Sequence, residues 1–563
     1  MITIGLETIM KSYRETTEKF SYSFMEYLMD LFDREGEKAT LGGFPCKIDK
    51  SCLTLGGLLR SSARLYIAEK NTDRAEQLEK RLLRFIEMIN EDTTTGPWGK
   101  QFILEALALL KKAGKLNIIP HERLEILEKK TDYGDFFNKE GLFIPKELGL
   151  PTNYYHVALT CATYREIIGF ENNGMSKKIA DKLLEIMINN SDDGWMDEVP
   201  PRGRFDSYSL DAYKTVYDSL EMAGKAVPEF IIKNAKEAVL IHLSAKNRHG
   251  HGFKYGRSLS VFGEAGTLRQ ICFGFKHGFI EEKDKDEAIA YCIHICERLI
   301  DFWYRKEENF FDIWTGSRAT DVYRGPDVIF NLNLGMCLAM AEVLEEFTKL
   351  GIDNYVPAKD VREPEKWEAR KTVFVKEVGK ERALYVLRRG THSFMLPFVG
   401  MSDKPNTVSD MYFAFPHQQE FTEAPVWRYH PFLVPEITTE DGTVAVLMEG
   451  FSRIEEKYED DRIIINVSGN LVARDTTPTD IEFDGKYVFD GRKITVKFNI
   501  HKPYRSARML FCGAKTDYVK FIGSECEEIN DVSEAKEFRA ACGGIKECKT
   551  AYFKDMIGYE IEL

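Results

Sequence analysis

The chain has 563 residues, of which 44% are hydrophobic and 30% charged, and its formal net charge is −13. This composition is typical of a soluble globular protein and excludes a disordered or low-complexity chain, while the length predicts two or three domains. The acidic balance disfavours nucleic acid as a partner, because sequence-independent binding needs a broad basic surface. Any anionic partner should therefore meet a local basic pocket.

Neither export nor a membrane partner is expected. The first residues, MITIGLETIMKSYRETTEKF, lack the basic start, continuous apolar core and small-residue cleavage site of a signal peptide. No later apolar run reaches the roughly 20 residues that a membrane span needs. The eleven cysteines show no C-x-x-C spacing, which argues against a disulfide framework or a zinc ribbon. These features favour a cytoplasmic location.

Up to about residue 350, apolar residues recur at the three- and four-residue spacing of amphipathic helices. In TDRAEQLEKRLLRFIEMINE the predicted apolar stripe consists of Leu78, Leu82, Leu83, Phe85, Ile86 and Ile89. Short clusters rich in Gly, Pro, Asn and Asp separate such segments, so we expect a series of helical hairpins. Hairpins in series either close into a toroid of inner and outer helices or stay an open solenoid, and periodicity alone does not distinguish the two.

After about residue 355 the period changes. Segments such as KTVFVKEV, RALYVLRR and RIIINVSGNLV are short, rich in Val, Ile, Phe and Tyr, and bounded by turn residues, as expected of antiparallel strands. The predicted fold class is therefore α+β multidomain. We expect an N-terminal (α/α) toroid of helical hairpins in residues 1–355 and an antiparallel β-sandwich domain in residues 356–563.

Four polar clusters precede or begin predicted helices: PTNYYHVAL, GRFDSYSLDAY, HGHGFKYGRSLS and TGSRATDVYRGPDV. If the starts of alternate helices point to the same end of a toroid, the four clusters converge on one pocket. Helix starts also present free N–H groups and the positive end of the helix dipole, which suit an anionic ligand.

The first three clusters contain the main candidates for acid–base chemistry, with Tyr208 in the second. Asn153 can supply an amide donor, and His156 a general acid or base, although packing at a helix interface would also explain His156. The glycine-rich loop holds His249, His251, Tyr255 and Arg257. We expect these four not to be core residues, because a buried loop would leave backbone polar groups unpaired. A solvated surface loop is the alternative.

Further residues of the clusters are candidates for substrate binding through stacking, hydrogen bonding or carboxylate recognition by arginine. Asp206 can also be interpreted as a helix N-cap. Trp195 and Trp314 can each be interpreted as a packing residue instead. These candidates are Trp195, Arg204, Asp206, Tyr213, His249, Trp314, Arg318, Tyr323 and Arg324.

Three stretches, DGWMDEVPPRGRFDSYSLDAY, KYGRSLSVFGEAG and FDIWTGSRATDVYRG, resemble the landmarks of a bacterial family of toroid proteins with a Tyr-Gly-Arg-Ser-Leu-Ser motif. The architecture of that family is similar to that of the heparinase II/III and chondroitin AC polysaccharide lyases. The resemblance covers roughly residues 150–335. This chain has Asp206-Ser207-Tyr208 where relatives often carry paired tyrosines, and its β domain fits the lyase plan by type of fold alone.

The resemblance implies a lyase that cleaves a uronic-acid-containing oligosaccharide or polysaccharide by β-elimination. Such a site must neutralise the substrate carboxylate, remove the adjacent proton and protonate the leaving oxygen. We expect Arg257 and Asn153 to bind the carboxylate, and Tyr208 and His156 to transfer protons, with Tyr255 and His251 in reserve.

Two other functions remain open. A toroid glycoside hydrolase would use two carboxylates, for which Asp193, Asp197 and Asp206 are available, and a non-catalytic carbohydrate-binding protein would use the aromatic residues alone. The abundance of Tyr, His and Arg in the clusters favours the lyase. Oligomer formation stays open.

No cofactor and no metal are expected. His249 and His251 are two residues apart but lack an evident third ligand. In the predicted β domain, Asp410, His417 and His430 are better explained as polar loop residues than as a zinc site.

Overall fold

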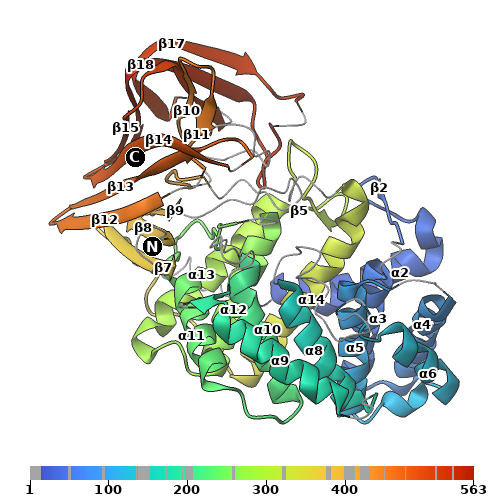
Figure 1. Ribbon diagram of the computed structural model, residues 1–563. Coiled ribbons are helices and arrows are strands. Elements are labelled where there is room, and N and C mark those ends of the chain that lie inside the picture. The colour runs from blue at the N-terminus through green and yellow to red at the C-terminus, as the bar shows by residue number, and fades with distance from the viewer. Residues whose placement is uncertain are drawn as a thin grey trace.

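The computed structural model describes residues 14, 16–48, 52–91, 95–134, 136, 153–170, 174–192, 194–196, 207–256, 260–319, 325–375, 382–398, 413–418, 432–448, 451–475, 477–513, 517–535 and 538–563. A helical part is followed by a β part (Figure 1). The last long helix ends at Lys349 and the first strand of the β part begins at Glu368, which confirms the predicted fold class. Within these ranges, no helix combines the length and apolar character needed to cross a membrane.

Six helices form a closed inner ring. Each contacts the next along the chain, and the last contacts the first, so the helical part is a toroid and not an open solenoid. The inner helices are α3 (Leu53–Ala68), α5 (Pro97–Lys112), α8 (Asn153–Ile168), α10 (Ser207–Met222), α12 (Ser260–Lys276) and α14 (Ile329–Lys349).

A second layer of helices covers the ring. Its members are α2 (Phe24–Glu35), α4 (Thr72–Glu91), α6 (His121–Lys130), α9 (Met175–Asn189), α11 (Glu229–Ser244) and α13 (Lys285–Arg298). Short helical turns accompany them: η1 (Lys19–Ser23), η2 (Gly36–Lys38), η3 (Leu116–Ile118), η4 (Glu282–Asp284), η5 (Leu299–Trp303) and η6 (Pro326–Val328). Inner and outer helices alternate along the chain, so neighbouring inner helices run parallel and begin at the same end.

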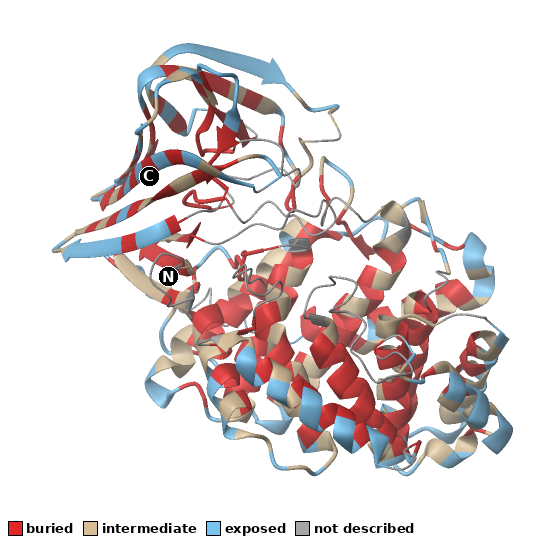
Figure 2. Cartoon of the chain, in the orientation of Figure 1, coloured by how far each residue is buried: buried red, intermediate tan, exposed pale blue. Residues whose placement is uncertain are grey.

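Burial follows this two-layer arrangement. In the outer helix α4, every residue of the predicted stripe is buried except Leu83, which is partly buried against the same core. The inner helix α14 is buried along most of its length, because other helices pack on both of its flanks. Figure 2 shows the consequence: buried residues are concentrated in the inner helices, and exposed residues on the outer helices and turns.

Short antiparallel hairpins lie between some outer helices and the inner helices that follow. They are formed by β1 (Thr40–Leu41) with β2 (Phe44–Pro45), β3 (Ser191–Asp192) with β4 (Trp195–Met196), and β5 (Tyr304–Arg305) with β6 (Phe310–Phe311). These connections all lie at the end of the toroid where the inner helices begin, which faces the β part (Figure 1).

The β part consists of two antiparallel sheets. The smaller contains β7 (Glu368–Val375), β8 (Arg382–Arg389) and β9 (His392–Phe398). The larger has the order β11-β10-β16-β18-β15-β14-β13-β12, with β17 also paired to β18. Its strands are β10 (Glu436–Thr439), β11 (Val444–Val446), β12 (Phe451–Glu459), β13 (Arg462–Val472), β14 (Pro478–Asp490), β15 (Lys493–Ile500), β16 (Tyr504–Gly513), β17 (Val519–Asp531) and β18 (Glu547–Glu562).

Aromatic side chains fill the space between the two sheets. The ring of Phe398 in the small sheet lies 5.2 Å from that of Tyr487 and 5.3 Å from that of Phe451 in the large sheet, measured between centroids. Both contacts are edge-to-face, the geometry that aromatic pairs prefer. The two sheets therefore pack face to face, as in a β-sandwich.

Arg318 joins the toroid to the β part. Its side chain is buried, and its guanidinium donates to the carbonyl oxygens of Cys542 at 3.1 Å, Asp312 at 3.0 Å and Phe302 at 3.1 Å. The neighbouring backbone N–H of Ala319 donates to the carbonyl of Ala540 at 2.9 Å. Because its donors are used in this contact, the predicted substrate-binding role of Arg318 is replaced by a structural one.

His294 binds the segment between α14 and β7, which connects the toroid to the β part. His294 on α13 hydrogen-bonds Asp360 through Nε2 at 2.8 Å and Glu297 through Nδ1 at 3.0 Å. Arg248 binds the same segment, 3.1 Å from Asp360 and 2.8 Å from Glu363. Although burial lowers the pKa of His294, the hydrogen bonds to the two carboxylates raise it to about 9.

This histidine should make stability depend on pH. Because the folded pKa of about 9 exceeds the ordinary 6.5, its stabilising contribution is complete below the ordinary value and disappears as the pH rises through 9. The contribution should be at most about 3 kcal/mol. Thermal melts of His294→Asn and wild type should differ clearly at roughly pH 6 and converge at roughly pH 10. The exposed His121 supplies the control His121→Asn, and an equal difference at both pH values would contradict the assignment.

Candidate functional site

The starts of the inner helices lie at one end of the toroid, and the described parts of the first two polar clusters begin α8 and α10 there. At the start of α5, the ring of Trp98 lies 6.2 Å from that of Tyr154 and 6.0 Å from that of His156, both in the first turn of α8. On the other side of the ring, the Asn331 side chain of α14 approaches Gly57 of α3, where an added Cβ would lie 3.2 Å from Asn331 Oδ1. We call this end, defined by Trp98, Tyr154, His156, Tyr208 and Asn331, the mouth.

His156 is a mouth residue whose pKa is shifted by burial. Its side chain is buried, and its Nδ1 has no hydrogen-bond partner among the described residues. Burial lowers the pKa of His156 to about 3, so the imidazole is neutral near neutral pH. An unpaired, neutral ring nitrogen can accept a proton or a hydrogen bond.

Tyr208 begins a polar stripe on α10. Tyr208, Asp211, Thr215 and Asp218 are all partly exposed and follow one another at spacings of three, four and three residues, which places them on one face of the helix. Gln270 on α12 donates to the Asp211 carboxylate at 2.9 Å. Burial raises the pKa of Asp211 despite the nearby Arg269 and Lys214.

Asp211 was not singled out from the sequence. The available signal was its position one helical turn after Ser207 within GRFDSYSLDAY, but the contact with Gln270 on another helix could not be read from that stretch.

Ion pairs line the axis of the ring below the mouth. Lys214 on α10 pairs with Glu342 on α14, although α12 separates these two helices in the ring, so the contact reaches across the interior. Arg269 on α12 binds Glu342 at 2.9 Å. Burial alone would raise the pKa of Glu342, but Arg269 and Lys214 hold it well below its usual range.

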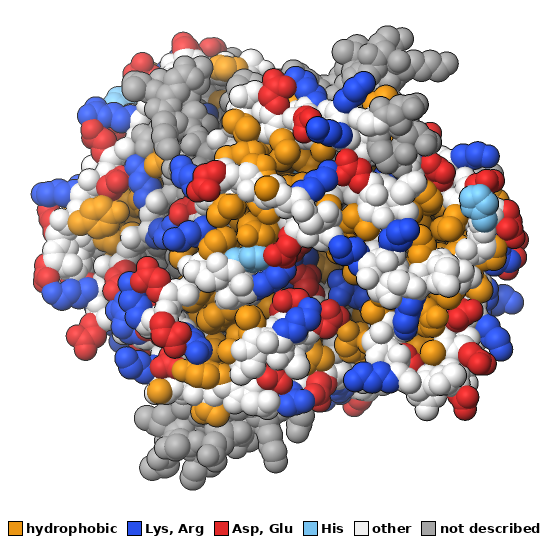
Figure 3. Space-filling view, turned by 90° about the horizontal axis from the view of Figure 1, so that it is seen from below, with side chains coloured by type: hydrophobic (Ala, Val, Ile, Leu, Met, Phe, Trp, Pro, Cys, Tyr) orange, Lys and Arg blue, Asp and Glu red, His pale blue; other side chains and the backbone are white. Residues whose placement is uncertain are grey.

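These interior charges are in contact with solvent. Arg269 and Glu342 keep 30% and 24% of their side-chain surface exposed, even though both lie on inner helices of a closed ring. Water must therefore reach the axis of the toroid, which we call the lumen. Figure 3 looks at the end of the toroid away from the β part and shows acidic and basic side chains together near the centre of that face.

The glycine-rich loop of residues 250–256 is buried, contrary to expectation. The Asn247 side chain accepts hydrogen bonds from the N–H groups of His249 at 3.0 Å and His251 at 3.1 Å, and donates to the His251 carbonyl at 2.9 Å. Thr267 accepts from the Phe253 N–H at 2.8 Å. The prediction failed because side chains outside the loop satisfy its backbone.

Two glycines allow the loop to lie directly on neighbouring backbone. A Cβ on Gly250, whose φ is +67°, would lie 2.0 Å from the carbonyl oxygen of His294. A Cβ on Gly252 would lie 2.3 Å from the carbonyl oxygen of Gly263. The glycines of this motif thus serve close packing.

Several candidates from the sequence are packed where the toroid meets the β part. Trp195 and Tyr255 are fully buried with ring centroids 5.5 Å apart, and both belong to a hydrophobic cluster shared with strands of the β part. Tyr213 is also fully buried, and His251 nearly so. For Trp195, Tyr213 and Tyr255, complete burial favours structural roles over the predicted catalytic or substrate-binding ones.

The positive charge of this loop faces a carboxylate of the protein itself. Lys254 lies 3.0 Å from Glu264 Oε1 on α12, and Arg298 lies 3.1 Å from the same atom. Burial would raise the pKa of Glu264, yet Lys254 and Arg298 keep it below its ordinary value. The lysine therefore neutralises a buried acid, which the sequence pattern did not reveal.

The remaining candidates are placed as follows. His249 is exposed and stacks on His251 with centroids 5.6 Å apart, and Trp314 is partly exposed beneath the guanidinium of Arg539 at 4.8 Å. Asn153 begins α8, and its side chain lies outside the description. The candidates outside the described residues are Arg204, Asp206, Arg257, Tyr323, Arg324, Asp193, Asp197, Asp410 and His430.

One group of described residues has the spacing of a metal site, near the opposite end of the lumen. Asp218, Glu221 and His277 bring their ligand atoms within 4.8 Å of one another. Lys276 already lies 2.6 Å from Glu221 and 3.5 Å from Asp218, and Lys214 lies 2.7 Å from Asp218, so two lysines balance the charge of the two carboxylates. In the β part, His417 is buried, and its backbone pairs with Met395.

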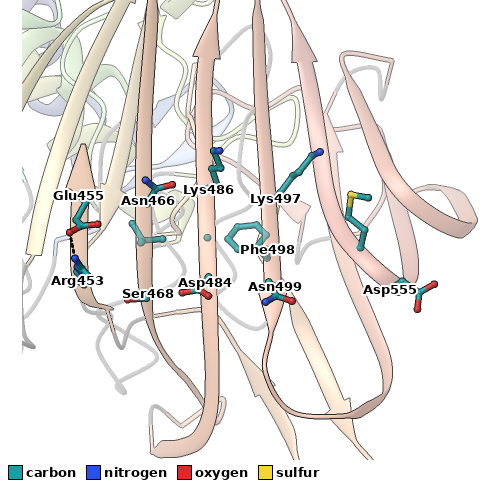
Figure 4. A pocket seen from close by; sticks show the side chains of 13 residues that line it. Arg453, Glu455, Asn466, Ser468, Asp484, Lys486, Lys497, Phe498, Asn499 and Asp555 are labelled. Carbon is teal, nitrogen blue, oxygen red and sulfur yellow. Dashed lines mark hydrogen bonds and ion pairs between the residues drawn. The ribbon is translucent and has the colours of Figure 1, made fainter. Parts of the chain in front are cut away.

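A pocket of about 470 Å³ lies on the outward face of the large sheet (Figure 4). Lys486 on β14 is directly opposite Lys497 on β15 and Asn466 on β13. The charged lining residues balance formally, with Arg453, Lys486 and Lys497 against Glu455, Asp484 and Asp555. None of the residues predicted from the sequence lines this pocket.

Comparisons with known proteins show similarity of architecture only. No protein-family model matches the chain, and no curated protein matches it. The solved structure of heparinase III aligns over 98% of this chain and 84% of its own, with a TM-score of 0.46 and 8% identity. With identity and TM-score this low, the match says nothing about activity.

Two further solved structures match mainly one part of the chain. A glycosyl hydrolase family 88 protein from Bacteroides vulgatus covers 58% of this chain and 99% of its own, with a TM-score of 0.37 and 10% identity. A polysaccharide lyase structure aligns over 62% of this chain and 98% of its own, with a TM-score of 0.36 and 10% identity.

The buried loop makes a direct prediction about stability. Gly252→Ala should destabilise the protein by at least about 2 kcal/mol, because the added methyl group would collide with the Gly263 carbonyl. Gly266→Ala, in the adjacent helix α12, should be neutral or stabilising by about 0.5–1 kcal/mol, because its Cβ would meet nothing within 4 Å. Denaturant unfolding measures both, and equal stabilities for the two variants would contradict the packing described.

Proposed function

We propose that the protein is a glycan-degrading enzyme whose substrate binds in the mouth of the toroid. The observation that carries the proposal is the set of aromatic and ionisable side chains at the starts of neighbouring inner helices, at one end of the lumen. Trp98 and Tyr154 offer ring faces and edges to a sugar, while His156, Tyr208 and Asp211 offer groups able to hold or transfer protons.

Within this class, we propose β-elimination on a glycan that contains uronic acid. Tyr208 and His156 form the proton-transfer pair, and Arg257 with Asn153 neutralises the substrate carboxylate. The neutral state of His156 supports its role, because a neutral imidazole can accept a proton and a bound carboxylate would raise its pKa from the low value of the free protein. The fully buried Tyr255 receives less support as a reserve, and His251 remains the reserve for His156.

A glycoside hydrolase is the second candidate, favoured by one observation. Asp211 is a carboxyl group on the lumen stripe of α10 whose pKa is raised by burial and which accepts a hydrogen bond from Gln270. A carboxyl with a raised pKa is the group that a hydrolase uses as general acid. The partner carboxylate would come from Asp193, Asp197 or Asp206.

The two activities are distinguished by their products. Uronic-acid oligosaccharides and polysaccharides should yield an unsaturated product that absorbs ultraviolet light if the protein is a lyase. New reducing ends without that absorbance would indicate hydrolysis. Binding without either signal would identify a non-catalytic carbohydrate-binding protein and contradict both enzymatic proposals.

Variants in the mouth test the assignment of residues. Tyr208→Phe and His156→Ala should each lower turnover roughly 100- to 10,000-fold while binding largely survives. Tyr217→Phe and His277→Ala are matched controls, because the rings of Tyr217 and His277 contact each other at a tilt, with centroids 4.3 Å apart, away from the mouth. Near-normal turnover of the mouth variants, or a loss that merely follows their melting temperatures, would refute the proposed pair. A selective loss in Asp211→Asn would support the hydrolase.

A further inference from the structure

Two cysteines face each other across neighbouring strands of the large sheet. Cys512 on β16 is the direct partner of Cys548 in the antiparallel pair with β18. Their Sγ atoms are 3.3 Å apart, and both side chains are buried, with 0% and 3% exposure. This pairing is a different observation from the mouth and does not depend on the proposed function.

The backbone spacing suits a covalent bond between the two sulfurs. Directly opposed residues of an antiparallel pair have Cα atoms about 4.5–5.5 Å apart, and the usual Cα separation in a disulfide is about 4.4–6.8 Å. A sulfur–sulfur bond is about 2.0 Å long, so the atoms must approach by a little over about 1 Å. Small rotations about the two χ1 angles can supply this movement without a shift of the strands.

The surroundings make the two thiols unequal. The Cys512 thiol donates a hydrogen bond to the Cys548 sulfur, and this bond, together with Thr550 and the charge of Arg508, lowers the pKa of Cys548. Burial and the neighbouring Cys548 raise the pKa of Cys512. Cys548 is therefore the sulfur that more readily becomes a thiolate, the nucleophilic form of cysteine.

We propose that Cys512 and Cys548 are a redox-active pair that closes into a cross-strand disulfide when the protein meets a peroxide. The Cys548 thiolate attacks one oxygen of hydrogen peroxide, the O–O bond breaks, and a sulfenic acid and water are produced once a proton is taken up. Cys512 then loses its proton and attacks the Cys548 sulfur, expelling a second water. Two thiols and one hydrogen peroxide thus become one disulfide and two waters.

The crosslink would act on the contact between the two parts of the chain. The segment between the cysteines contains β17 and the turn Ala540–Gly544, whose backbone pairs with Arg318 and Ala319 of the toroid. Joining β16 to β18 closes this segment into a loop and reduces the freedom of the unfolded chain. We therefore expect the oxidised protein to melt a few degrees higher than the reduced one.

Peptide mapping of the full-length protein tests the proposal. The reduced protein is treated with a small excess of hydrogen peroxide, its remaining thiols are alkylated in denaturant, and its peptides are analysed without reduction. We expect a peptide pair joined through Cys512 and Cys548, its loss after dithiothreitol, and a higher melting temperature before that reduction. Alkylation of both cysteines after oxidation, or a bond from either to another cysteine, would overturn the proposal.

Variants separate this pair from general oxidation. Cys526 on β17 is exposed, so Cys526→Ser is the matched control and should keep the crosslink and the shift in melting temperature. Cys512→Ser should lose both and leave Cys548 as a sulfenic or more highly oxidised acid. An unchanged shift in Cys512→Ser would contradict the assignment, and if this variant does not fold, the wild-type peptide map still decides the question.

Discussion

The architecture depends on one constraint: charged side chains on the inner helices meet along the axis of the ring and stay partly exposed to solvent. Water that reaches this axis requires polar residues on the inward faces of helices that are otherwise apolar. The chain meets this requirement with ion pairs such as Lys214–Glu342, which reaches across the lumen, and Arg269–Glu342. Separating the helices would leave the partly buried charged side chains of these pairs without their partners. The pairs therefore also fix the relative positions of α10, α12 and α14.

A second feature, the buried loop of residues 250–256, joins the toroid to the β part. The backbone of the loop is hydrogen-bonded by the side chains of Asn247, Thr267 and Tyr291. The hydrophobic cluster of the β part also includes Trp195 and Tyr255 of the toroid. The toroid and the β part therefore share a buried contact, formed by this loop together with Arg318.

Local patterns in the sequence predicted local structure well. The change from helical to strand periodicity and the buried stripe of α4 follow from residue spacing, which is a property of single elements. The burial of the glycine-rich loop was missed because Thr267 and Tyr291, which bond its backbone, lie on other helices, and because the local role of Asn247 was not recognised. Asp211 and Glu342 were missed for the same reason: their environment is made by Gln270, Arg269 and Lys214 across the ring.

Hydrogen–deuterium exchange with an acidic oligosaccharide tests most directly whether the mouth is the ligand site. The account predicts slower exchange in the first turns of α5, α8 and α10, around Trp98, His156 and Tyr208, when the oligosaccharide is present. Slower exchange confined to β13–β15, around the pocket that contains Lys486 and Lys497, with no change at the inner-helix starts, would contradict it.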